Sequence, residues 1–240
     1  MRQLREACGV FGLFNHPDAA AVTALGLQAL QHRGQESAGL VAGDAKGLRR
    51  HVGMGLVTRV FGPAQVAALP GSNAIGHVRY STTGASTIDN AQPFLAAHAG
   101  GMLALAHNGN IVNGPVLRQA ILQQGATLMS SSDSEVLLRL ILDHPSPNPE
   151  AQIAGMMAQA EGAYSLVLLS EQALTAVRDP RGFKPLVLGR LGNATVVTSQ
   201  TAALDLVGAV YEREIAPGEI LRIDATSQRS IIPLPPVAAA

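Results

Sequence analysis

The chain has 240 residues, of which 47% are hydrophobic and 14% are charged, and 17 Lys and Arg balance 17 Asp and Glu. This composition excludes a disordered chain, and the absence of net charge and of Trp argues against nucleic acid or an anionic membrane as a partner. One cysteine, no zinc-like Cys/His spacing and no apolar run of membrane-spanning length predict a cytoplasmic protein without disulfides, metal ligands or membrane spans.

The apolar pattern predicts strands along the whole chain. Alternation or short apolar runs place them at Val10–Phe14, Gly39–Ala42, Ala74–Tyr80, Met102–Ala106, Tyr164–Leu169, Leu174–Arg178, Leu186–Gly189, Ala194–Thr198 and Glu219–Ile223.

Capping signals predict helices between these strands. Asp18 is expected to cap a helix that carries Val22, Leu25 and Ala29 and ends before Gly34. Further helices are expected from Pro115 to about Gly125, from a Ser132-Asp133-Ser134-Glu135 capping box through Leu142, from Asn148 to before Gly162, and from Ser199 to before Gly208. Because the helices come in consecutive groups and the late strands in a run, we predict an α+β fold with antiparallel sheets.

The only cysteine, Cys8, follows a short polar leader and precedes Gly9 and the first predicted strand. A single cysteine among apolar residues is more often a small core residue than a nucleophile. Its location favours the nucleophile, because removal of residues 1–7 would leave a thiol and a free α-amine on one residue. The amine titrates near ~8 and the thiol near ~8.5, so the amine can accept the thiol proton at neutral pH. We therefore predict a cleavage between Ala7 and Cys8.

Two motifs carry basic side chains. Gln31-His32-Arg33-Gly34-Gln35 is accounted for as a basic helix end that glycine stops. In Gly76-His77-Val78-Arg79-Tyr80-Ser81-Thr82, a strand puts His77 and Arg79 on one face. An exposed polar face and a functional site are about equally compatible with that pattern. In the functional interpretation, the planar guanidinium of Arg79 binds the α-carboxylate of an amino acid.

Two motifs carry neutral donors and an acid. His107-Asn108-Gly109-Asn110 ends an alternating strand, and Asn-Gly by itself is a hairpin signal. An Asn amide beside a Gly backbone N–H also supplies the two donors that an oxyanion hole requires. Asp133 is favourable in the first turn of a helix whatever its function. It is also a candidate partner for the ammonium group of an amino acid.

Together these motifs resemble one family. Cys8-Gly-Val-Phe-Gly, Leu30-Gln-His-Arg-Gly-Gln-Glu36, Gly76-His-Val-Arg-Tyr80, Ala106-His-Asn-Gly-Asn110, Ser132-Asp-Ser-Glu135 and Asp179-Pro-Arg-Gly-Phe-Lys-Pro-Leu186 occur in this order. The set resembles the glutaminase domain of the amidophosphoribosyltransferases, which catalyse the first step of de novo purine synthesis. The likeness extends from about Cys8 to Asp224 and implies an N-terminal nucleophile hydrolase with a four-layer αββα sandwich of two antiparallel sheets.

The resemblance also implies residue roles. Cys8 matches the nucleophile that attacks the glutamine carboxamide to give a thioester and ammonia, and Asn108 and Gly109 match the oxyanion-hole donors. The residues that match the substrate-binding surroundings are Arg79 for the carboxylate of glutamine, Asp133 for its ammonium group, Arg33 and Gly34 in a loop beside the nucleophile, and Tyr80 in a gating segment. Residues 1–7 resemble a propeptide, residues 8–230 the amidotransferase domain, and residues 231–240 a tail.

Three departures from the family pattern stand out. Lys184 occupies a position where many members have Arg, and it cannot reproduce a bidentate fork. Ser199-Gln200-Thr201 replaces Ser-Glu-Ser, which puts a local charge pair in doubt. No strand ending in paired acids and followed by a Gly-Thr phosphate loop is found, so the phosphoribosyltransferase domain is expected to be absent from these residues.

The missing domain affects the expected cofactors and partners. This chain alone is expected to bind neither Mg²⁺ nor phosphoribosyl pyrophosphate, and no iron–sulfur ligands are found. Its partners would be glutamine and a phosphoribosyltransferase domain supplied elsewhere. The sequence leaves open whether the chain forms a homo-oligomer. The rival interpretations are the glutaminase domain of a glucosamine-6-phosphate synthase or asparagine synthetase, and a non-catalytic regulatory module of the same fold.

Overall fold

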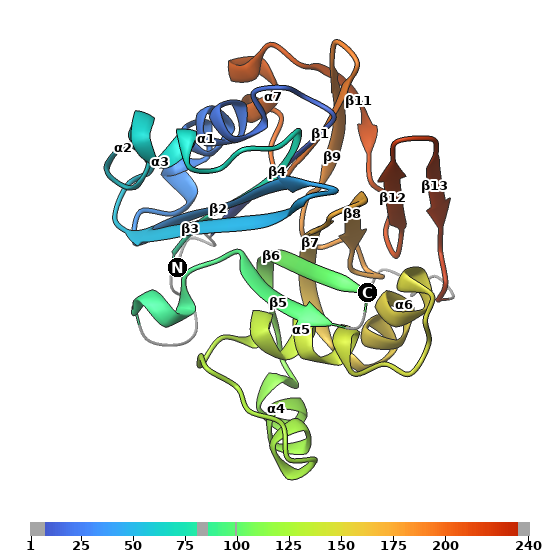
Figure 1. Ribbon diagram of the computed structural model, residues 1–240. Coiled ribbons are helices and arrows are strands. Elements are labelled where there is room, and N and C mark those ends of the chain that lie inside the picture. The colour runs from blue at the N-terminus through green and yellow to red at the C-terminus, as the bar shows by residue number, and fades with distance from the viewer. Residues whose placement is uncertain (1–7, 81–85, 99, 235–240) are drawn as a thin grey trace, which may run out of the picture.

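A computed structural model describes residues 8–80, 86–98 and 100–234 of the chain. Two antiparallel sheets lie face to face, and helices cover the outer face of each (Figure 1). The layers therefore run helix, sheet, sheet, helix. The predicted α+β fold and the four-layer sandwich that the resemblance implied are both confirmed.

The first sheet contains the N-terminal strand. Its members are β1 (Gly9–Phe14), β2 (Ser37–Asp44), β3 (Gly47–Met54), β4 (Asn73–Arg79), β9 (Val187–Leu191), β10 (Ala194–Thr198) and β11 (Val210–Glu214). Their order across the sheet is β11-β9-β10-β1-β4-β2-β3. The central strands β1 and β4 are buried along their whole length; β1 is entirely apolar or glycine, whereas β4 also buries Asn73, His77 and Arg79.

The second sheet is built from the middle and the end of the chain. Its members are β5 (Phe94–His98), β6 (Gly101–Ile111), β7 (Gly162–Ser170), β8 (Ala173–Arg178), β12 (Ile220–Asp224) and β13 (Gln228–Ile231). Their order is β13-β12-β8-β7-β6-β5. β6 is longer than its edge neighbour β5, which pairs with it only from Gly101 to Leu105. The last residues of β6 therefore have a strand neighbour on one side, β7, and none from β5 on the other.

The helices form the two outer layers (Figure 1). Those on the first sheet are α1 (Ala19–Ala29), α2 (Val57–Val60), α3 (Pro63–Ala67) and α7 (Ala202–Val207). Those on the second sheet are α4 (Gly114–Gln123), α5 (Asp133–Leu142) and α6 (Pro149–Gln159). Single 3-10 turns at Gln31–Arg33 and Ile88–Asn90 complete the chain's helical segments among the described residues.

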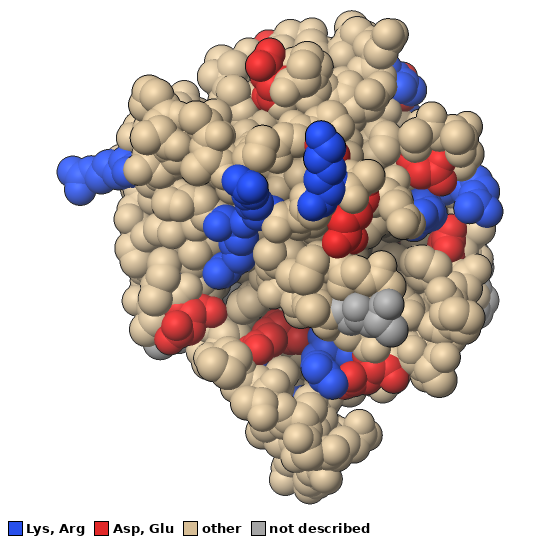
Figure 2. Space-filling view, in the orientation of Figure 1, with Lys and Arg blue, Asp and Glu red and all other residues tan. Residues whose placement is uncertain are grey.

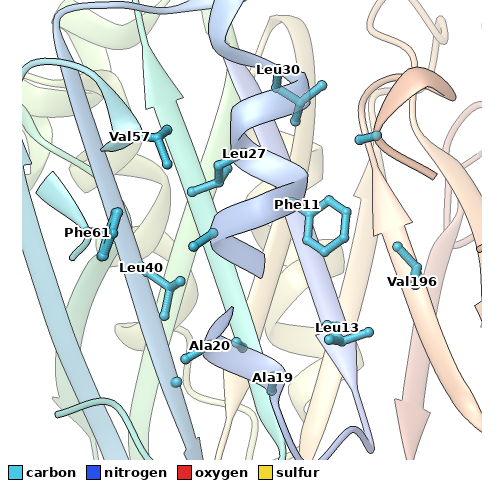
Figure 3. Packing of buried hydrophobic residues seen from close by; sticks show 14 of the residues in the cluster. Phe11, Leu13, Ala19, Ala20, Leu27, Leu30, Leu40, Val57, Phe61 and Val196 are labelled. Carbon is cyan, nitrogen blue, oxygen red and sulfur yellow. The ribbon is translucent and has the colours of Figure 1, made fainter. Parts of the chain in front are cut away.

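The outer core packs α1 against the first sheet. Figure 3 shows Leu27 of α1 and Leu30, the residue that follows the helix, in one buried cluster with Phe11 and Leu40 of the first sheet. Burial of each such leucine contributes roughly 1.5–3 kcal/mol to folding. Gly26 lets the helix approach closely, because a Cβ there would lie 2.5 Å from Phe11 Cδ2. The helix thus lies flat on β1 and fixes the strand that begins just after Cys8.

A second core fills the space between the sheets. It joins Val10 and Ile75 of the first sheet to Ala106 and Val167 of the second, all of them fully buried. Small side chains on β6 allow the two sheets to approach. This layer places the start of β1 opposite the second half of β6, so it determines which residues of the two sheets can meet.

The structure corrects several predicted details. Asp18 precedes α1 without a side-chain cap, and Leu25, predicted on its apolar face, is 38% exposed. Ser132 does cap α5, but Glu135 bonds the N–H groups of Met129 and Ser130 instead of closing a capping box. α7 begins at Ala202, later than predicted, because Ser199 is hydrogen-bonded to β1.

The folded part of the chain continues past residue 230, where the tail was predicted to begin. Ile231 is the last residue of β13, and Leu234 still packs against the core of the second sheet. Residues 1–7 and 235–240, which belong to the predicted propeptide and tail, lie outside the described residues. Within the described ranges, no helix is long and apolar enough to cross a membrane.

The surface is chemically mixed. On the face in Figure 2, basic and acidic side chains are interspersed among uncharged areas, in line with the balanced composition. A cavity of about 710 Å³ is lined by residues of β6, β7, β8, β12, α5 and α6, among them Leu103, Thr175, Arg222 and Ile153. None of the predicted site residues lines it, so it is separate from the candidate active site.

Candidate active site

Cys8 lies immediately before β1, the central strand of the first sheet. Val10, two residues later, is held on both sides, since it pairs with His77 of β4 and bonds the backbone and hydroxyl of Ser199. The φ of Cys8 is 64°, in the left-handed region that residues other than glycine rarely adopt. Such a conformation persists only where the surroundings impose it, and it often marks a functional residue.

The loop after α1 encloses the backbone of Cys8. The N–H of Cys8 donates to the carbonyl of Arg33 at 2.9 Å, and the buried Arg33 Nε donates back to the carbonyl of Cys8 at 2.7 Å. Gly34 is required by a close approach, because a Cβ there would lie 2.7 Å from the backbone N and C of Arg79. The structure thus brings Arg33 and Gly34 against Cys8 and the end of β4, as the resemblance implied.

The thiol of Cys8 is held by the backbone of Tyr80. Cys8 Sγ lies 3.4 Å from the carbonyl oxygen of Tyr80, to which it donates, and 3.5 Å from its amide nitrogen, from which it accepts. Tyr80 itself is 53% exposed. Burial raises the pKa of the thiol, while the Tyr80 hydrogen bond and the charges of Arg79 and Arg33 act in the opposite direction. The charge of Asp133 also reaches the thiol and raises its pKa.

This raised pKa predicts slow alkylation of Cys8 while residues 1–7 are attached. The thiolate is the reactive form, and it becomes abundant only above the ordinary thiol pKa of ~8.5. The rate with iodoacetamide should therefore keep rising with pH beyond that value. The urea-unfolded chain is the control, and because Cys8 is the only cysteine, its modification can be read from intact mass. A plateau of the native rate below about pH 8.5 would contradict the assigned environment.

Arg79 occupies the end of β4, on the same face of the strand as His77. Its side chain is 95% buried, and Nη1 lies 3.4 Å from Glu36 Oε2. Glu36 also accepts a hydrogen bond from the hydroxyl of Ser86 at 3.1 Å. The guanidinium is therefore oriented by the Glu36 carboxylate, and its charge reaches the thiol of Cys8. A guanidinium in this position can bind a second carboxylate.

Asn108 and Gly109 lie in the second half of β6. Asn108 is fully buried, and neither Oδ1 nor Nδ2 of its side chain has a hydrogen-bond partner among the described residues. A buried amide without a partner costs roughly 1–3 kcal/mol, which a bound ligand oxygen can recover. Gly109 has a φ of 150°, and a Cβ there would lie 2.0 Å from the carbonyl oxygen of Ala163. Only glycine fits.

The free edge of β6 presents the Gly109 N–H. Backbone groups alternate between the two edges of a strand. The N–H groups of His107 and Ile111 point away from β7, toward side chains of Gln92 and Asp133 respectively. By this alternation the N–H of Gly109 points to the same edge. Asn108 and Gly109 thus offer one side-chain donor and one backbone donor close to the first sheet.

Asp133 begins α5 and faces that edge. Its Oδ2 accepts from the N–H of Ile111 at 3.1 Å, and its Oδ1 lies 3.7 Å from Nδ1 of His107. The carboxylate remains 17% exposed, so it can still receive a cation. Burial lowers the pKa of His107; the charge of Asp133 opposes this and the charge of Lys184 adds to it, and the pKa is lowered on balance. His107 is therefore a neutral ring behind the carboxylate, and the negative charge of Asp133 is left for a ligand.

Two of the three departures from the family pattern, Lys184 and Gln200, lie among the described residues, and the structure shows their hydrogen bonds. The backbone of Lys184 holds the loop: its N–H donates to Asp179 Oδ2 and its carbonyl accepts from Arg178 Nε. Gln200 Oε1 lies 3.0 Å from His32 Nε2, so a hydrogen bond from an uncharged amide stands where the family pattern raised the question of a charge pair.

Sequence reasoning missed several residues around the site. Glu36 and Ser134 lay within recognised motifs but received no role, and Gln92 was not singled out. Ser134 Oγ bonds both His107 Nδ1 and Gln92 Nε2 at 2.9 Å. The one available signal was polarity, since these are polar residues between segments that are otherwise buried. Among the described residues, no group of three or more His, Cys, Asp or Glu side chains is arranged to hold a metal ion.

Comparisons with known proteins agree with this geometry. The family described as glutamine amidotransferase domain matches residues 77–206. The chain is 48% identical to amidophosphoribosyltransferase 3, chloroplastic, of Arabidopsis thaliana over 92% of its length, and 44% identical to amidophosphoribosyltransferase of Bacillus subtilis over 96%. The solved B. subtilis glutamine phosphoribosylpyrophosphate amidotransferase, complexed with ADP and GMP, superposes with a TM-score of 0.90 at 43% identity over 95% of the chain. The chain spans only 42%, 48% and 49% of these three relatives, respectively.

Proposed function

This chain belongs to the family of glutamine amidotransferase domains, and from that premise we propose that it hydrolyses glutamine to glutamate and ammonia with Cys8 as an N-terminal nucleophile. The single observation that carries the proposal is the setting of the thiol. It is held by the backbone of Tyr80, within reach of the charges of Arg79 and Asp133. A cysteine that only fills an apolar core would not be expected beside two charges of opposite sign.

Removal of residues 1–7 would supply the base. With the leader attached, the nitrogen of Cys8 belongs to an amide and has no basicity. Once freed it becomes an α-amine that titrates near ~8. Its hydrogen bond to the Arg33 carbonyl at 2.9 Å then holds the amine in place, so that it can take the proton of the thiol on the same residue.

The reaction follows from this arrangement in two stages. Sγ attacks the carboxamide carbon of glutamine, and the thiol proton passes to the α-amine. The oxygen of the tetrahedral intermediate accepts from Asn108 Nδ2 and the Gly109 N–H, which stabilise its charge. The amine returns the proton to the leaving nitrogen, and ammonia departs as the thioester forms. Water then attacks the thioester, the amine again accepts a proton, and glutamate leaves as Sγ recovers its hydrogen.

Arg79 and Asp133 select the amino-acid end of the substrate. The guanidinium binds the α-carboxylate, and the carboxylate of Asp133 binds the ammonium group. Tyr80, exposed beside the thiol, covers the bound substrate. The substrate thus brings one charge for each of two fixed charges, which neither a simple amide nor a peptide interior would do.

The ammonia would serve the synthesis of phosphoribosylamine from phosphoribosyl pyrophosphate, as the names of the relatives suggest. That chemistry needs a phosphoribosyltransferase domain, with its Mg²⁺ and phosphoribosyl pyrophosphate, beyond the residues described above. We place the protein in the cytoplasm and expect that such a domain accompanies it, in the same molecule or in trans. Homo-oligomer formation is compatible with this arrangement.

The Arg79→Lys variant tests the substrate clamp. A lysine keeps the positive charge but loses the bidentate fork, so ground-state binding should weaken by about 10–100-fold, seen as a raised KM for glutamine. Because the lost bonds form in both ground and transition states, kcat should change little. Glutamate and ammonia released from glutamine are measured together. Arg59→Lys, a surface change, is the control, and an unchanged KM in Arg79→Lys would remove Arg79 from the clamp.

A further inference from the structure

His77 joins the two sheets directly beside the candidate active site. It lies on β4 of the first sheet, where it pairs with Val10 of β1. Its ring Nε2 lies 3.0 Å from the backbone carbonyl oxygen of His107 on β6 of the second sheet. His77 is fully buried and His107 is 98% buried, so no water competes for this bond.

The bond lies where β6 has β7 on one side and no strand on the other. β5 pairs with β6 only as far as Leu105. At His107, side chains replace the missing strand: Gln92 Oε1 accepts from the N–H at 2.8 Å, and the ring of His77 lies on the carbonyl. An unpaired backbone group in the interior is costly, so these two side chains are needed to complete the edge.

This carbonyl belongs to the peptide that carries the nitrogen of Asn108. Whatever fixes the carbonyl therefore also fixes the start of the Asn108–Gly109 segment. On the other sheet, His77 is adjacent to β1, which begins one residue after Cys8, and it shares its strand and face with Arg79. One ring thus links β4, the strand of the clamp and the neighbour of β1, to β6, the strand of the oxyanion donors.

We propose that His77 is a positioning residue, a neutral cross-sheet donor that sets the distance between Cys8 and the Asn108–Gly109 donors. This inference rests on the proposed glutaminase function. A carbonyl only accepts, so Nε2 carries the hydrogen. Burial lowers the pKa of His77 to about 3, so the ring stays neutral and keeps one tautomer throughout the pH range in which the protein would work.

Paired variants test the donor. His77→Gln keeps an N–H at the position of Nε2, whereas His77→Phe keeps the ring and removes it. Displacement of a reacting group by about 1 Å costs ~100-fold, so kcat should fall by roughly 10–100-fold in His77→Phe with little change in KM. His77→Gln should recover most of that loss. His51→Phe is the matched control. His51 lies on the remote strand β3, and its Nε2 also meets a backbone carbonyl, that of Val60 in α2.

A readout without catalysis separates this inference from the proposed function. In the unsubstituted protein, long-range ¹H–¹⁵N correlation spectra should show His77 as the neutral Nε2–H tautomer. In His77→Phe, but not in His51→Phe, the amide resonances of Asn108 and Gly109 should move. If glutamine is not hydrolysed at all, these spectra still decide whether His77 positions the segment. An Nδ1–H tautomer, an imidazolium, unmoved amides, or equal kcat losses in His77→Gln and His77→Phe would each overturn it.

Discussion

Replacement of Cys8 by alanine is expected to abolish ammonia release from glutamine. Loss of a covalent nucleophile removes the whole two-stage route, and losses of about 10⁴-fold or more are usual for such residues. The same loss is expected when an uncleavable leader keeps residues 1–7 attached, because the Cys8 nitrogen then stays an amide and cannot accept the thiol proton. Turnover is measured as glutamate formed per chain, with intact mass reporting the first residue.

The two variants have separate controls. Cys8→Ala should leave the free energy of unfolding within about 1 kcal/mol of the parent, since one small buried side chain replaces another. For the leader, a chain in which Cys8 follows directly after a removable Met should be active without further processing. Full turnover by the chain with an uncleavable leader would rule out the α-amine as the base.

Replacement of Asn108 by alanine is expected to lower kcat by about 10²–10³-fold, the usual effect of losing one oxyanion donor. KM should change little, because the donor acts on charge that develops only in the transition state. The substitution also removes the unpartnered buried amide, so the unliganded protein should not lose stability in proportion. Increased stability with low kcat would be the signature of a group kept for chemistry.

Asn73→Ala is the matched control for Asn108→Ala. Asn73 is also a buried asparagine in a strand, but its Oδ1 accepts the N–H of Asn15 at 2.9 Å, at the far end of β4 from Arg79. It should therefore destabilise the protein and leave kcat of the folded fraction unchanged. An Asn108→Ala variant with a raised KM and normal kcat would place Asn108 in substrate binding and not in the oxyanion hole.

The fold class could be predicted from the sequence because the buried strands are apolar. The missed strands are those at or near the sheet edges, where packing does not dictate the residue type. β3 carries Arg49, Arg50 and His51, and β11 carries alternating acids and bases, so neither shows the apolar pattern of a buried strand. Charged edge strands resist pairing with other molecules, and the same charges conceal them from a hydrophobicity pattern.

The grouping of the candidate residues was predictable where they stand in short motifs. Cys8, Arg79, Asn108 and Asp133 stand in such motifs, and the structure places Arg79 and Asp133 within electrostatic reach of the thiol. The supporting residues were not predictable, because their role depends on contacts between distant segments. Gln92 is an example: it lies just before β5 and meets His107 because β5 begins at Phe94, opposite Leu105, and leaves the rest of that edge of β6 open.

The measurement that tests the central claim most directly is the mass of peptides from protein quenched in acid during turnover with glutamine. The account predicts one γ-glutamyl group, bound as a thioester, on a peptide whose first residue is Cys8. Hydroxylamine added before the quench should remove it as the hydroxamate. Ammonia release without an acyl group on Cys8, or an acylated Cys8 that still carries residues 1–7, would contradict an N-terminal cysteine nucleophile.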